Sequence, residues 1–148
     1  MNTISRSYTF CAAHRIEGHP KCGRLHGHNY VVTVQLYGIR DSETGMVLDY
    51  GLLDEVVKPL IDSFDHRYIV SQSNIRNMDP YINPATFHGD IALSPDLAAS
   101  TAECLSDMFA KWILRRLVEK HGHAVALSIV VDVQETEKSH ASCVLEIQ

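Results

Sequence analysis

Two stretches near the start of the chain alternate between apolar and polar side chains. Residues 3–11 and residues 29–38 each place most of their aliphatic and aromatic side chains on one parity and most of their polar side chains on the other. A period of two predicts half-buried β-strands. The turn-rich residues 41–45 then separate the second strand from a short third strand, which we predict at residues 46–48.

Two other segments have the i, i+3, i+4, i+7 spacing of amphipathic helices. Asp49 is the predicted N-cap of the first helix, whose apolar positions run from residue 53 to residue 61. Pro59 lies within this helix and is expected to kink it or to end it early. Ser100 is the predicted N-cap of the second helix, because Ser100 and Glu103 have the spacing of a capping box.

The order of these elements predicts an α+β fold. The second helix is expected to end at His121–Gly122 and to be followed by a hairpin of residues 125–135 and 143–147. Residues 70–99 are punctuated by prolines and are predicted to form a long inserted loop without regular structure. We therefore expect a single domain over residues 1–148, built on an antiparallel sheet.

The composition agrees with a globular domain and excludes several classes of function. The chain has 148 residues, of which 45% are hydrophobic and 21% charged. A formal net charge of -5 provides no basic surface, so we expect no nucleic acid as a direct partner. No apolar run is long enough to span a membrane and no leader-like segment precedes the first strand, so we expect no membrane partner. The four cysteines form no C-x-x-C pair, which predicts free thiols in a reducing, cytoplasmic environment.

Candidate chemistry is concentrated between residues 14 and 28. His26 and His28 are two residues apart, so on a strand both side chains point to one face, and His14 has the parity of the apolar residues of the first strand. Neighbouring strands would bring the three imidazoles together, which is a typical protein contribution to a catalytic zinc site. Cys22 precedes His26 by four residues. Its thiolate could be a fourth ligand, which would make the site structural, or a base or nucleophile that faces a substrate.

Two further positions carry candidate chemistry. Asp65 precedes His66 after the first helix, where the pair either works as a proton shuttle or is simply solvated. Glu135 continues the apolar parity of its strand, so its carboxylate either accepts from two adjacent N–H groups of a ligand or has reached solvent. The remaining cysteines are predicted to be small core residues: Cys11, Cys104 and Cys143.

Together these motifs resemble the 6-pyruvoyl-tetrahydropterin synthase / 6-carboxy-tetrahydropterin synthase family. The resemblance covers residues 3–69 and 100–147. It is carried by Phe10-Cys11-Ala12-Ala13-His14, Cys22-x-x-x-His26-Gly27-His28, Asp49, Asp65-His66, Ser100-Thr101-x-Glu103 and Glu135-Thr136. The spacing from Cys22 to His26 is similar to that of the 6-carboxy branch, which acts in queuosine biosynthesis.

The resemblance implies a tunnelling fold (T-fold), an antiparallel four-stranded sheet with two helices on one face. It also implies that the sheets of several subunits join into a barrel, as trimers stacked into hexamers, with active sites at subunit interfaces. Residues 70–99 and 137–142 are longer than the resemblance leads us to expect. Both stretches adjoin candidate active-site motifs, so both could reshape the pocket or the interface.

The resemblance assigns a role to each candidate residue. Three would bind Zn²⁺: His14, His26 and His28. Three would carry the proton transfers: Cys22 as the general base, with Asp65 and His66. Three would bind the pterin: Glu135 as the anchor, with Thr101 and Glu103 nearby. Three are candidates for holding a triphosphate: Arg15, Lys21 and Arg24.

The implied substrate is 7,8-dihydroneopterin triphosphate, and the implied products are 6-carboxy-5,6,7,8-tetrahydropterin, acetaldehyde and triphosphate. Zinc would act as a Lewis acid on the side-chain hydroxyls, and no external redox cofactor is implied, because the ring is reduced at the expense of its own side chain. One alternative is a 6-pyruvoyl-tetrahydropterin synthase or related pterin aldolase in folate or biopterin supply. An alternative of another class is a non-catalytic zinc- or pterin-binding subunit in which the zinc is structural.

Overall fold

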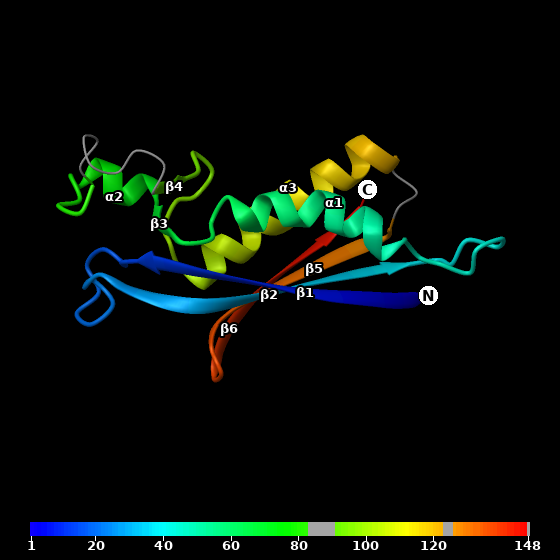
Figure 1. Ribbon diagram of the computed structural model, residues 1–148, viewed down its shortest axis with the longest axis horizontal. Helices are drawn as coiled ribbons and strands as arrows, with labels where there is room; N and C mark the ends of the chain where they lie inside the picture. Colours follow the sequence, from blue (N-terminus) through cyan, green and yellow to red (C-terminus); the bar gives the residue numbers. More distant parts are fainter. Residues whose placement is uncertain (83–90, 123–125, 148) are drawn as a thin grey trace.

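A six-stranded sheet forms the base of the molecule (Figure 1). The structure, a computed structural model, describes residues 1–82, 91–122 and 126–147. Four long strands pair antiparallel in the order β1-β2-β5-β6. Their bounds are β1 (Asn2–His14), β2 (His26–Gly38), β5 (Ser128–Thr136) and β6 (Ser139–Glu146). The predicted alternation is confirmed in β1 and β2, because most inward-facing residues of these two strands are buried and their neighbours are more exposed.

Two short strands extend the sheet beyond β1 and make it a mixed sheet. β3 (Arg67–Val70) pairs parallel with β1, and β4 (Ile91–Leu93) pairs parallel with β3. The expectation of a purely antiparallel four-stranded sheet was therefore wrong for one subunit. These strands are too short to show a period of two, and their pairing with distant segments leaves no local signal.

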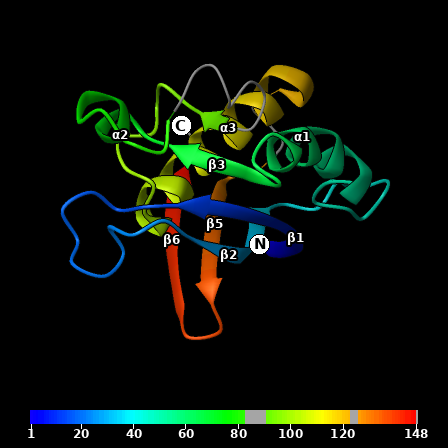
Figure 2. The same ribbon diagram turned by 60° about the vertical axis from the view of Figure 1, so that its left-hand side comes forward.

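Parts of the segment 70–99 have regular structure, contrary to the expectation of a structureless loop. Ser71 caps the short helix α2 (Gln72–Arg76) in a capping box with Asn74. The strand β4 closes the segment, and residues 83–90 lie outside the described residues. Figures 1 and 2 place α2 and β4 at one end of the molecule, beside the connection from β1 to β2.

Two longer helices cover one face of the sheet (Figures 1 and 2). Asp49 caps α1 (Tyr50–Asp62) by accepting a hydrogen bond from the Gly51 amide, as predicted. The helix continues through Pro59, so the expectation that Pro59 ends it early was wrong. Proline has no backbone N–H, so the carbonyl of residue 55 loses its helical partner. Pro59 lies near the C-terminal end of α1, so only about one turn of helix follows this missing hydrogen bond.

The second long helix, α3 (Ala102–His121), begins one residue later than the sequence suggests. Its N-cap is Thr101, whose hydroxyl accepts from the Cys104 amide, rather than Ser100. The Ser100 hydroxyl instead donates to the Arg15 carbonyl. The helix ends at Gly122, as predicted, and this glycine adopts a φ of +81° that favours a residue without a Cβ.

The connections also differ in detail from the predictions. Residues 46–48 form no strand, although Leu48 packs against the core. Residues 139–142, expected to lengthen the last connection, belong to β6, so that β5 and β6 are joined by a tight turn.

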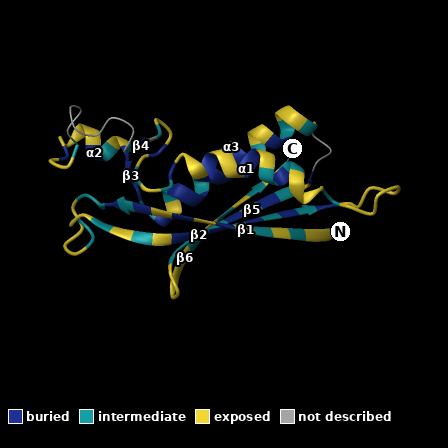
Figure 3. Ribbon diagram, viewed as in Figure 1, coloured by how far each residue is buried: buried dark blue, intermediate teal, exposed yellow. Residues whose placement is uncertain are grey.

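The core lies between the sheet and the two long helices. Figure 3 shows buried residues where α1 and α3 face the strands. The ring of Phe10 stacks on that of Tyr30 at 4.7 Å between centroids, and Phe109 packs edge-on against Phe10. Cys104 and Cys143 pack against this core, but Cys11 is exposed on the opposite face, so the prediction for Cys11 was wrong. Among the described residues, no helix is long and apolar enough to cross a membrane.

Candidate metal and pterin site

The three predicted histidines converge where β1 ends and β2 begins. The antiparallel register pairs His14 with His26 and Ala12 with His28, which brings all three imidazoles to the helix-covered face of the sheet. One ring nitrogen from each lies within 4.8 Å of the other two. Such a spacing suits three ligands of one metal ion and leaves a fourth position for water or substrate.

Backbone carbonyls determine which nitrogen of two of these imidazoles is available. His14 Nδ1 lies 2.7 Å from the Ser100 carbonyl, and His26 Nδ1 lies 2.7 Å from the Arg24 carbonyl. A carbonyl can only accept, so each Nδ1 carries the proton and each neutral ring presents the lone pair of Nε2. His14 Nε2 is buried and has no hydrogen-bond partner among the described residues, which fits a position reserved for a metal.

Burial keeps the imidazoles of His14 and His28 neutral, which is the form that binds metals. His14 is 0% exposed, and burial lowers its pKa from 6.5 to about 4, with a smaller contribution from the neighbouring His26 and His28. Burial also lowers the pKa of His28, again helped by His26. At neutral pH, protons therefore compete little with a metal ion for these two imidazoles.

Glu135 faces the histidines from β5. The ladder with β6 shifts register between Gln134 and Thr136, and Glu135 keeps the parity of the buried residues that precede it in β5. Its Oε1 atom lies 3.8 Å from His14 Nε2 and is buried without a hydrogen-bond partner among the described residues. Burial raises the pKa of the carboxyl, and the nearby Glu103 raises it further. A partly buried carboxylate with one unpaired oxygen suits a ligand that brings its own N–H donors.

The other two predicted pterin-binding residues lie at the start of α3. Glu103 is exposed and close enough to Glu135 to influence its ionisation. The Thr101 hydroxyl is occupied as the N-cap of the helix. The structure thus places Glu103 beside the candidate anchor and gives Thr101 a structural task.

Cys22 lies in the loop between β1 and β2, half-buried, and is not part of the group of metal-binding atoms among the described residues. Its backbone is held on both sides, since its amide donates to His19 Nδ1 and its carbonyl accepts from the Ile16 amide. A Cβ on Gly23 would lie 2.5 Å from the His19 carbonyl oxygen, so the close turn after Cys22 requires glycine.

Asp65 and His66 form a separate pair in this subunit. His66 Nδ1 lies 2.9 Å from the Asp65 carboxylate, which also accepts from the Cys11 amide. These bonds lower the pKa of Asp65, the Cys11 amide being the larger cause. Within the described ranges, no hydrogen bond or ion pair joins either residue to Cys22 or to the three histidines. His66 lines an open pocket of about 560 Å³ together with His28 and Cys11.

Sequence reasoning missed the contact that orients His14. The Ser100 carbonyl orients His14, a backbone contact that leaves no signal in the side-chain pattern. Tyr30 follows His28 on the same face, and its ring centroid lies 5.5 Å from that of His28 and 6.0 Å from that of His14. Its buried hydroxyl has no hydrogen-bond partner among the described residues. Strand parity predicts Tyr30 to be a core residue, and the structure confirms that it is buried.

An α+β fold with a three-histidine donor set and a buried acidic residue beside it defines a class of candidate metal-dependent enzymes. Residues 3–146 match the family model described as 6-pyruvoyl tetrahydropterin synthase. The chain therefore belongs to this family, and the function is of the tetrahydropterin synthase type, that of a lyase-type enzyme acting on pterins.

Individual relatives agree with this assignment. A Methanocaldococcus jannaschii protein provisionally named 6-carboxy-5,6,7,8-tetrahydropterin synthase is 32% identical over 128 residues, which cover 79% of this chain and 78% of that protein. The 6-carboxy-5,6,7,8-tetrahydropterin synthase of Rickettsia felis is 43% identical over 76 residues, 50% of this chain and 55% of that protein. The crystal structure of 6-pyruvoyl tetrahydropterin synthase from Plasmodium vivax has a similar fold, with a TM-score of 0.78, 19% identity and coverage of 99% of this chain and 100% of that one.

Proposed function

We propose that this chain converts 7,8-dihydroneopterin triphosphate to 6-carboxy-5,6,7,8-tetrahydropterin with release of acetaldehyde and triphosphate, in a zinc-dependent reaction of queuosine biosynthesis. The observation that carries the proposal is the three-histidine donor set facing the unpaired carboxylate of Glu135. The names of relatives that match the sequence support the 6-carboxy product.

The residues present fit a zinc ion. His14, His26 and His28 would hold it, because their ring nitrogens lie close together and two of the rings are oriented by backbone carbonyls. When bound, zinc supplies Lewis-acid polarisation of the hydroxyls of the pterin side chain. The absence of Cys22 from the donor group supports an open, catalytic type of site over a structural one.

Glu135 would anchor the pterin ring. Its Oε1 atom is buried and has no partner in the part of the chain that the structure describes, so the carboxylate can accept from two adjacent N–H groups of an aminopyrimidinone edge. Such a ligand would satisfy the buried charge, and a pterin without those donors would leave it unpaired. This difference provides recognition of the ring independently of the metal.

Cys22, Asp65 and His66 would handle the protons. Cys22 would remove a proton from the side chain of the substrate, and His66, oriented by Asp65, would relay protons during the internal reduction of the ring. Since the pair lies apart from Cys22 in one subunit, we propose that a homo-oligomer, a trimer or hexamer, completes the site at a subunit interface. Lys21 and Arg24, both exposed in the Cys22 loop, are candidates for the triphosphate.

The likeness to 6-pyruvoyl tetrahydropterin synthases supports a second candidate function, formation of a 6-pyruvoyl product. The two candidates are separated by incubating zinc-loaded protein with 7,8-dihydroneopterin triphosphate and identifying products by mass spectrometry. A 6-carboxy product with acetaldehyde supports the main proposal, a pyruvoyl product supports the second, and no turnover by protein with bound zinc contradicts both.

A Cys22→Ala variant tests the role of the thiol. We expect zinc content to remain near the wild-type level while turnover falls about 100-fold or more, as for loss of a general base. Cys143→Ala, which removes a cysteine on β6, is the matched control and should retain activity. Loss of zinc together with unfolding in Cys22→Ala would instead identify a structural ligand.

A further inference from the structure

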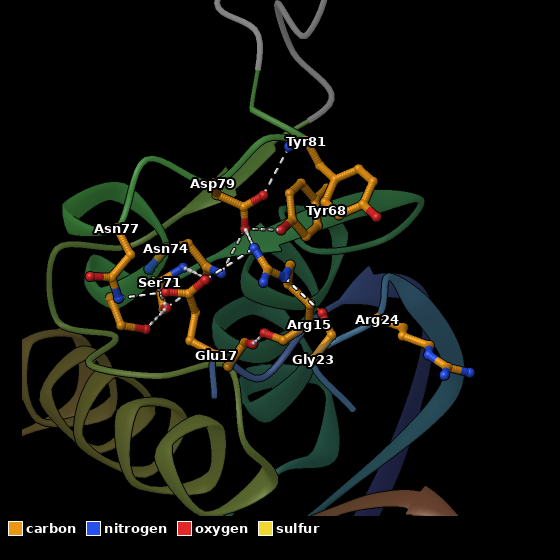
Figure 4. A network of polar contacts seen from close by, with 12 residues as sticks. Arg15, Glu17, Gly23, Arg24, Tyr68, Ser71, Asn74, Asn77, Asp79 and Tyr81 are labelled. Atoms are coloured by element: carbon orange, nitrogen blue, oxygen red, sulfur yellow. Dashed lines mark hydrogen bonds and ion pairs between the residues drawn. The ribbon is translucent and has the colours of Figure 1, made fainter. Parts of the chain in front are cut away.

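A buried carboxylate lies beside the Cys22 loop, in the segment that follows β3. The Asp79 side chain is 0% exposed. It accepts hydrogen bonds from the Tyr68 hydroxyl, the Asn74 amide at 2.8 Å and the Tyr81 backbone amide at 2.9 Å, and it lies 3.3 Å from the Arg15 guanidinium. Figure 4 shows these partners converging on Asp79. So many partners are what a buried charge requires.

Arg15 connects this carboxylate to the loop that carries Cys22. Its Nε atom donates to the Gly23 carbonyl at 2.9 Å, and its Nη1 atom lies 3.0 Å from Glu17 (Figure 4). Gly23 directly follows Cys22 in the chain. Arg15 therefore ties the end of the loop to its beginning and to Asp79 at the same time.

The same residue also reaches the candidate metal site. The Arg15 carbonyl accepts from the Ser100 hydroxyl at 2.9 Å, and the Ser100 carbonyl orients His14 at 2.7 Å. One side of the network thus leads to the candidate base and the other to a candidate metal ligand. A shift of Asp79 or Arg15 would change the position of the Cys22 loop relative to the histidines.

The ion pairs of Arg15 leave its guanidinium unavailable to a triphosphate. The guanidinium faces the carboxylates of Glu17 and Asp79, and its side chain is 15% exposed. A triphosphate would have to displace both carboxylates. Arg24, by contrast, points away from this network (Figure 4).

We propose that Arg15 and Asp79 are positioning residues for the reaction, which hold Cys22 at a set place relative to the three histidines. The segment 71–81 then supports the active-site loop through Asp79. This inference rests on the proposed function, in which Cys22 is the base. Small misplacements of a reacting group are enough to slow an enzyme by about 10- to 100-fold.

Two variants test the proposal in the full-length, zinc-loaded protein. Asp79→Asn keeps the shape of the side chain and removes its charge, and Arg15→Lys keeps the charge but cannot reach the Gly23 carbonyl and both carboxylates together. We expect kcat to fall about 10- to 100-fold in both, with KM within about threefold of wild type and zinc content unchanged. We also expect the pH profile of Cys22 alkylation by iodoacetamide, resolved by peptide mass spectrometry, to shift in both.

Asp54→Asn is the matched control for a purely structural effect. Asp54 pairs with Arg6 at 2.7 Å and accepts from the Tyr8 hydroxyl, so it repeats the chemistry of the network away from the site. It should lower stability while leaving kcat and the alkylation profile of Cys22 unchanged. If Asp79→Asn and Arg15→Lys also lower only stability, the positioning role is overturned.

The proposed function can fail separately from this inference. Full activity of Cys22→Ala would reject Cys22 as the base. The alkylation profile and hydrogen exchange of residues 16–24 would still measure the position and order of the loop. If both the alkylation profile and the hydrogen exchange are unchanged in Asp79→Asn and Arg15→Lys, the inference is overturned. A change in either measurement would support the part of the inference that concerns the position of the Cys22 loop.

Discussion

The pH dependence of stability tests directly whether burial keeps the His14 imidazole neutral in the folded protein. His14 is 0% exposed, and burial is the main cause of a pKa of about 4 in place of 6.5. In a His14→Asn variant the side-chain amide can still donate to the Ser100 carbonyl from the position of Nδ1, but it does not ionise. The variant therefore removes the titration and keeps the hydrogen bond.

The expected magnitude follows from proton linkage. The unfolded chain binds a proton at His14 near pH 6.5, and the folded chain only near pH 4. Protons thus favour the unfolded state in this interval, so stability is lost as pH falls from about 6.5 towards 4. The free energy of unfolding should lose about 2 kcal/mol from this group between about pH 8 and pH 5, and roughly 3 kcal/mol once the loss is complete.

Urea unfolding of chelator-treated protein at a fixed protein concentration measures this loss. Metal must be absent because it binds the neutral imidazole, and the concentration must be fixed because association stabilises the folded state. Between about pH 8 and pH 5 the wild-type protein should lose about 2 kcal/mol more than His14→Asn.

The control variant is His66→Asn. It removes an exposed histidine at a φ of 57°, which asparagine tolerates, so the loss of stability that depends on His14 should persist in this variant. Parallel curves for wild type and His14→Asn would refute the reasoning, because they would mean that the fold does not hold this imidazole neutral.

Three further substitutions have expected outcomes. Glu135→Gln should lower kcat/KM about 100-fold and yet raise the free energy of unfolding of the metal-free protein at pH 7 by about 1 kcal/mol, because the carboxylate, whose pKa is raised by burial, is destabilising once ionised. Steady-state kinetics measure the first effect and urea unfolding the second, and a variant less stable than wild type would contradict the prediction. Gly23→Ala should cost about 1–3 kcal/mol in thermal unfolding, because its Cβ would lie 2.5 Å from the His19 carbonyl oxygen. Thr101→Ala should cost about 1 kcal/mol through loss of the helix cap to Cys104, and an unchanged melting temperature would show that the cap is not used.

Features that depend on local backbone geometry were predictable from the sequence. Strand parity placed His14, His26 and His28 on one face, and the structure brings them together there. Asp49 caps its helix as expected, because an aspartate before an amphipathic segment satisfies an orphan amide of the first turn. The parity of the last long strand also brought Glu135 to the face of the histidines.

Features that depend on contacts between distant residues required the tertiary structure. The helix cap moved from Ser100 to Thr101 because the Ser100 hydroxyl is used by the Arg15 carbonyl, far away in the sequence. Arg15 was a candidate for holding a triphosphate, but in the structure its guanidinium pairs with the buried Asp79. The periodicity of a strand or a helix depends on residues that are close together in the sequence, so it can be recognised there. The partner of a buried polar group is chosen by packing, because desolvation forces it to pair with whatever the fold brings within reach.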